Sequence, residues 1–116
     1  MFLFESFAEW KAYSELEKKS LVDVVIEYER LQKGRSEATI MEGLSNAWTV
    51  MKEAVQTGLH EDMTSRSGMI NNGAKKVYNY PLPVLSKEFQ NLISRALAAK
   101  EVNSCMGRIV AAPTAG

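Results

Sequence analysis

Residues 36–59 read SEATIMEGLSNAWTVMKEAVQTGL, and this stretch decides the fold class. Ser36 can cap a helix whose first turn holds Glu37, because a serine hydroxyl accepts from free N–H groups and an acidic side chain suits the positive end of the helix. Apolar residues then recur at steps of three and four: Ile40, Leu44, Ala47, Trp48, Met51 and Val55. This spacing predicts a long amphipathic helix that ends near Gly58 and buries its apolar face.

Serines also mark the starts of three other helices. They predict helices from Ser6 to about Lys19, from Ser20 to about Leu31 and from Ser86 to near Gly107. A short helix is expected from Ala74 to about Tyr78. The last helix is expected to carry a broad apolar face: Phe89, Leu92, Ile93, Ala96, Leu97, Val102, Met106, Ile109 and Val110. Because no segment alternates with the period of a strand, the predicted fold class is all-α, with about five helices.

An ordered polar loop is predicted near residues 60–73, HEDMTSRSGMINNG, which lack periodicity and contain two glycines. Within it, the stretch Thr64, Ser65, Arg66, Ser67 and Gly68 combines three hydroxyls, a guanidinium and a glycine backbone. Such groups suit recognition of a small carboxylate or phosphate. On composition alone, a plain connecting loop whose serines bond to nearby backbone is the favoured interpretation. The residues alone leave both interpretations open.

Composition limits the class of protein. At 116 residues the chain has room for one domain at most, and 14 basic residues balance 14 acidic ones. Without a basic stripe we expect no nucleic-acid partner, and without an apolar run of about 20 residues we expect no membrane span. Because residues 1–5 contain no basic residue, we expect no signal peptide there. The single cysteine, Cys105, fits a reducing cytoplasm and is expected to lie buried beside Met106 and Ile109.

Three stretches carry a resemblance to a known family: residues 50–59 (VMKEAVQTGL), residues 65–69 (SRSGM) and residues 98–116 (AAKEVNSCMGRIVAAPTAG). In this order they are similar to the alpha chain of the iron–sulfur-dependent L-serine dehydratases, and the third stretch is the most specific. Where that family has a run like Thr-Gly-Gly-Asp-Ala, this chain has Ile70-Asn-Asn-Gly-Ala74. Because asparagine tolerates the left-handed conformation, we expect the turn there to persist.

The resemblance implies an L-serine ammonia-lyase that forms pyruvate and ammonia. It implies a [4Fe–4S] cluster as Lewis acid, held by three cysteines that follow the Pro-Thr-Ala-Gly turn, so that the metal ligands lie outside this chain; it also implies no pyridoxal phosphate. The implied partners are L-serine, the remainder of the alpha domain and a beta domain or subunit, while homo-oligomerisation stays open. Residues 1–116 would then be the N-terminal helical part, truncated after Gly116 and inactive alone.

Two hypotheses follow for the site and for the chain. From the resemblance, Ser65, Arg66, Ser67 and Gly68 are expected to meet the C-terminal turn at the rim of the substrate pocket, with Arg66 pairing with the serine carboxylate. The residues of that turn are Pro113, Thr114, Ala115 and Gly116. The alternative for the whole chain is a self-sufficient helical module that binds a partner without catalysis. Exposed apolar surface on residues 89–116 would favour the enzyme part, and a well-packed last helix would favour the module.

Overall fold

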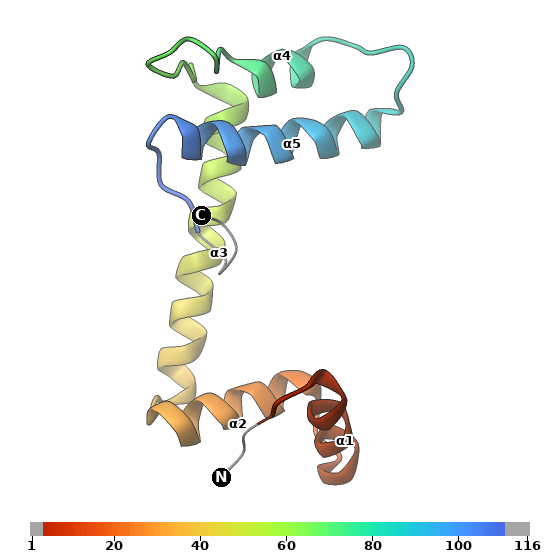
Figure 1. The fold of residues 1–116 in the computed structure, drawn as a ribbon, viewed down its shortest axis with the longest axis vertical. Coiled ribbons are helices and arrows are strands. Elements are labelled where there is room, and N and C mark those ends of the chain that lie inside the picture. Colours follow the sequence, from red (N-terminus) through yellow and green to blue (C-terminus); the bar gives the residue numbers. More distant parts are fainter. Residues whose placement is uncertain (1–3, 111–116) are drawn as a thin grey trace. The chain divides into compact units, whose positions relative to one another are not determined.

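The computed structural model describes residues 4–110, and these residues contain helices but no β-strand (Figure 1). The helices are α1 (Phe7–Glu17), α2 (Leu21–Lys33), α3 (Glu37–His60), α4 (Gly73–Asn79) and α5 (Lys87–Ser104). The predicted all-α class is therefore confirmed. The chain forms two compact units, residues 1–45 and 46–116, and α3 runs through the boundary between them.

The predicted helix starts are confirmed by their hydrogen bonds. The Oγ atoms of Ser6, Ser20, Ser36 and Ser86 each accept from the N–H three residues on, at 3.1–3.3 Å. At Ser20 the bond is reciprocal, because Asp23 Oδ2 accepts from the Ser20 N–H at 3.3 Å. These bonds satisfy N–H groups that have no partner within the helix.

The first unit packs α1 against α2. Among residues 4–45, Val24 is the buried aliphatic residue, and the Phe4 ring lies 5.6 Å from that of Tyr13 and 6.2 Å from that of Tyr28. Lys19, placed between the helices, forms an ion pair with Glu27 at 2.7 Å. Two apolar residues of α1, Phe7 and Leu16, are exposed.

The second unit has a small core where α3, α4 and α5 meet. Leu59, Ala74 and Ala98 are fully buried there, with Val55 and Leu97 packed against them. In Figure 1, α4 and α5 run side by side and are connected by the loop that follows Tyr80. Small side chains at the contact let these helices approach closely.

The apolar face predicted for α3 is only partly confirmed, because Ile40, Ala47 and Val55 are half-buried but its largest side chains are not. Leu44, Met51 and Trp48 are exposed, and Trp48 retains 59% of its accessible surface, with Lys52 Nζ 5.7 Å from its ring. The buried face instead holds four small or aliphatic residues: Val50, Ala54, Gly58 and Leu59. Burial follows the face that can approach α5 closely, because close-packed helices select small residues rather than the largest apolar ones.

The predicted end and apolar face of α5 also need correction. The helix ends at Ser104, because Met106 takes a left-handed conformation (φ 64°) and the N–H groups of Met106 and Gly107 bond back to the carbonyls of Asn103 and Val102. This is the Schellman arrangement of a helix end. Met106 is 94% exposed, Cys105 is half-buried at the helix end, and Phe89 and Leu92 are exposed. The buried residues of α5 are Gln90, Ser94, Ala98, Glu101 and Val102.

Candidate functional site

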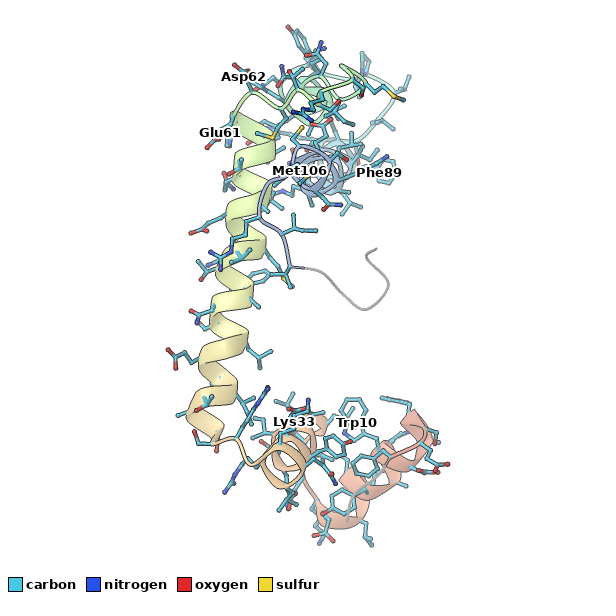
Figure 2. All side chains as sticks on the ribbon, turned by 60° about the vertical axis from the view of Figure 1, so that its left-hand side comes forward. Trp10, Lys33, Glu61, Asp62, Phe89 and Met106 are labelled. Carbon is cyan, nitrogen blue, oxygen red and sulfur yellow. The ribbon has the colours of Figure 1, made fainter. Side chains whose placement is uncertain are left out.

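The polar loop between α3 and α4 is ordered by bonds across its base. Figure 2 shows Glu61 and Asp62 at the end of α3, where the loop begins. The Asn72 N–H donates to the Met63 carbonyl at 2.8 Å, and Asn72 Oδ1 accepts from the Met63 N–H at 2.7 Å. Asn72 has the expected left-handed conformation, with φ 55°. The predicted ordered loop is thus confirmed, and Asn72 closes it.

The tip of this loop is a tight turn that contains the predicted site residues. The Gly68 N–H donates to the Ser65 carbonyl at 2.9 Å, and Gly68 has a φ of 72°, which favours glycine. The Ser65 N–H donates to the Ile70 carbonyl at 3.0 Å, while Ser65 Oγ accepts from the Ile70 N–H at the same distance. The turn therefore presents Arg66 and Ser67 outward.

The two serine hydroxyls are partly used inside the loop. Their Oγ atoms lie 3.2 Å apart, and Ser67 Oγ also accepts from the Met69 N–H at 3.4 Å. One hydroxyl hydrogen bridges the pair, which leaves the other hydrogen free for a ligand. The local-turn interpretation thus describes most of the serine bonds, but it leaves one hydroxyl donor available.

Arg66 is exposed, and within the described residues its guanidinium has no ion-pair partner. Its five N–H donors are therefore free for a planar acceptor such as a carboxylate. The other half of the expected site, Pro113, Thr114, Ala115 and Gly116, lies outside the described residues. The meeting of the two segments remains a prediction.

Two buried polar residues of α5, which the sequence pattern did not identify, hold the ends of α4. Glu101 is 4% exposed, and its Oε1 and Oε2 accept from the Ala74 N–H at 3.1 and 3.2 Å. Gln90 Nε2 donates to the carbonyls of Val77 and Tyr80, both at 2.6 Å. The acceptor thus sits at the positive end of α4 and the donor at its negative end. A clue was available for Glu101, because it begins the Glu-Val-Asn motif (residues 101–103) within the third family-matching stretch.

A groove of about 860 Å³ lies elsewhere on the second unit, lined by α3 residues such as Trp48 and His60 and by Arg95 of α5. His60 meets Tyr78 edge-on at 5.6 Å between ring centroids. The Ser65–Gly68 turn does not line this groove. The groove and the predicted site are therefore separate features.

The described residues do not fit an iron–sulfur cluster. In residues 4–110 no three histidine, cysteine, aspartate or glutamate side chains gather as metal ligands, and the whole sequence contains one cysteine. A cluster needs three or four ligands, mostly cysteine thiolates. Separately, none of the helices in the described part has the length and apolar character needed to span a bilayer.

Comparison with known proteins places the chain. The model of the family described as "Serine dehydratase alpha chain" matches residues 16–116, which include α3, the Ser65–Gly68 turn and α5. The chain belongs to the serine dehydratase alpha-chain family. It is 36% identical over 104 residues to the "Probable L-serine dehydratase, alpha chain" of Bacillus subtilis (strain 168). It is 30% identical over 99 residues to the "L-serine dehydratase, alpha chain" of Peptoniphilus asaccharolyticus.

These alignments cover 86% and 83% of this chain but only 34% of each relative, so the chain spans about a third of their length. No solved structure matches it significantly. The three stretches of this chain that resemble the serine dehydratase alpha-chain family lie in definite structural elements. Residues 50–59 lie in the C-terminal part of α3, residues 65–69 form the tip of the loop, and residues 98–104 of the third stretch form the last turns of α5.

Proposed function

We propose that this chain is the N-terminal part of an L-serine ammonia-lyase that converts L-serine to pyruvate and ammonia. The observation that carries the proposal is the family match over residues 16–116, together with relatives named as L-serine dehydratase alpha chains. In this reaction the α-proton and the β-hydroxyl of serine leave as water, and the resulting aminoacrylate takes up water to release ammonia and pyruvate. The chain would act with the remainder of the alpha domain and with a beta domain or subunit.

Under this proposal the Ser65–Gly68 turn binds the substrate carboxylate. The free Arg66 guanidinium can form two parallel hydrogen bonds with a carboxylate, and the spare hydroxyl hydrogen of the Ser65–Ser67 pair adds one donor. An exposed turn of this kind provides one wall of a pocket. The other walls, the [4Fe–4S] cluster with its cysteine ligands and the base that takes the α-proton, would come from segments outside this sequence. We therefore assign no chemical step to the residues of this chain.

The exposed apolar surface of α5 is consistent with such additional segments. Phe89 and Leu92 retain 50% and 63% of their accessible surface, and Figure 2 shows Phe89 on the side of α5 that faces away from α3. A helix face of this kind is typical of a contact with further protein. The proposal also places the enzyme in the cytoplasm, where a free thiol such as Cys105 stays reduced.

Substitutions in the turn test this role in the intact enzyme. Arg66→Ala should raise the KM for L-serine by roughly tenfold to a hundredfold, because one charge-assisted pair is lost. Arg66→Lys should recover part of the affinity, and Ser67→Ala should have a smaller effect. Arg95→Ala is the matched control, since Arg95 is an exposed arginine of the same unit outside the turn. Unchanged kinetic constants in both Arg66→Ala and Ser67→Ala would contradict the carboxylate-binding role.

A further inference from the structure

We propose that Glu101 is a positioning residue that fixes the Ser65–Gly68 turn through the start of α4. The inference rests on the proposed function, because it assigns a structural support to the substrate-binding turn. Glu101 is the first residue of the Glu-Val-Asn motif, and it lies against the element that directly follows the turn-bearing loop. The structure thus connects two segments that lie 27 residues apart in the sequence.

The contact at the start of α4 is close and buried. Asn72, at the N-cap of α4, makes no side-chain bond to that helix, and Glu101 from α5 supplies the acceptor instead. Its carboxyl group lies directly over Gly73, where a Cβ atom would sit 2.5 Å from Oε1. A Cβ atom at position 73 would therefore require the Glu101 carboxyl group to shift. Gly73 and Glu101 therefore form a single contact that holds the start of α4.

The loop is directly connected to the Gly73–Glu101 contact, without an intervening residue. Asn72 precedes Gly73, and its backbone N–H and side-chain Oδ1 both bond to Met63 across the base of the loop. The Ser65–Ile70 bonds then continue the pairing up to the turn. A displacement of Gly73 and Ala74 would shift Asn72. The Asn72–Met63 bonds at the base of the loop would then move, and the orientation of Arg66 would change. Positional errors of about 1 Å in such supports can reduce catalysis by a factor of 10².

The other end of α4 offers a matched control. Gln90 is also a buried polar residue of α5 that bonds to the backbone of α4. Its contacts lie at Val77, Tyr80 and Leu82, which are in the last turn of α4 and just after it, at the end remote from the loop. Loss of Gln90 leaves two carbonyls and one N–H without their partner, whereas loss of Glu101 leaves one N–H. Gln90→Ala should thus destabilise the unit at least as much as Glu101→Ala.

The kinetic test compares these variants in the intact enzyme with L-serine as the probe. Glu101→Ala is expected to raise KM about tenfold, and Gly73→Ala should do the same by displacing the carboxyl group. The KM of the double variant should not exceed that of the more impaired single variant, because both substitutions break the same contact. Glu101→Gln retains an acceptor and should restore most of the affinity. Gln90→Ala should leave KM within about twofold of the wild type while lowering the melting temperature.

Amide hydrogen exchange on the 116-residue chain provides a second readout, which does not require activity. In Glu101→Ala and Gly73→Ala the N–H groups of Ser65, Ile70 and Asn72 should exchange faster, whereas in Gln90→Ala they should not. Equal effects of Glu101→Ala and Gln90→Ala on KM and on exchange would overturn the inference in favour of general destabilisation. If the wild-type enzyme releases no pyruvate, the proposed function fails, and the exchange pattern alone decides whether Glu101 positions the turn.

Discussion

Gly58 of α3 lies directly against Ala98 of α5: a Cβ atom on Gly58 would be 2.5 Å from the Ala98 carbonyl oxygen and 2.7 Å from the Ala98 Cβ. The backbones of the two helices therefore touch, and no side chain fits between them. We expect Gly58→Ala to lower the free energy of unfolding by about 1–3 kcal/mol, because overpacking costs that much. This loss exceeds the roughly 1 kcal/mol that alanine gains over glycine in a helix.

Gly43→Ala is the control for that substitution. Gly43 lies in the same helix, and no atom comes within 4 Å of the position its Cβ would occupy. Here the helix propensity acts alone, so we expect a gain of roughly 1 kcal/mol. Urea unfolding monitored by circular dichroism measures both. If Gly58→Ala stabilised the chain as much as Gly43→Ala, α3 and α5 would not be in close contact at Gly58.

The large apolar side chains of α3 should contribute less to stability than their size suggests. We expect Trp48→Ala to cost about 1 kcal/mol or less, because the side chain is mostly exposed. Leu59→Ala should cost about 2–5 kcal/mol, since Leu59 is 1% exposed and fills the core. Thermal and urea unfolding of the 116-residue chain compare the two. A larger loss of stability from Trp48→Ala than from Leu59→Ala would show that α3 buries the apolar face expected from the sequence.

Replacing Met106 with glycine should stabilise the end of α5. A residue other than glycine pays for the left-handed conformation, and the exposed Met106 side chain offers little contact in return. We expect Met106→Gly to raise the free energy of unfolding by about 0.5–1 kcal/mol. Gly107→Ala should have the opposite effect, because its Cβ would lie 2.5 Å from Val102 Cγ1. Destabilisation by Met106→Gly would mean that this side chain has contacts on which the helix end depends.

The Lys19–Glu27 pair predicts a pH dependence in the alkaline range. The hydrogen bond from Lys19 Nζ to Glu27 raises the pKa of Lys19 above its ordinary 10.5. Because the folded-state pKa is the higher one, the pair contributes fully below pH 10.5 and its contribution is lost as the pH rises through the folded value. Alkaline melting curves should thus fall more steeply for the wild type than for Lys19→Met. Lys18→Met, at the exposed neighbour, should keep the wild-type slope; identical slopes for all three proteins would contradict the contribution.

Local sequence signals predicted the helices well but not the faces that they bury. The capping serines act within three residues, so the starts of α1, α2, α3 and α5 could be predicted from the sequence. Burial depends on distant partners. Gln90 and Glu101 are buried because their polar groups bond to the backbone of α4, and no periodicity rule anticipates that contact. For the same reason the exposed Phe89 was expected inside.

For the candidate site, the sequence identified the residue types and the structure supplied their arrangement. The polar composition of residues 60–73 indicated a loop, and the left-handed Asn72 was expected from its side-chain chemistry. The sequence did not predict which side chains of the turn bond within the loop. The Ser65 hydroxyl accepts from the Ile70 N–H, whereas the Arg66 guanidinium stays free. That difference depends on how the chain folds back at Gly68.

The most direct test of the proposed function is anaerobic release of pyruvate from L-serine. The intact enzyme that carries residues 1–116 is assayed after reconstitution with iron and sulfide, and the 116-residue chain alone is assayed in parallel. We expect pyruvate and equimolar ammonia from the longer protein and none from the chain alone. No pyruvate from either, with iron incorporation verified, would contradict L-serine as the substrate and would favour a helical module that binds a partner without catalysis.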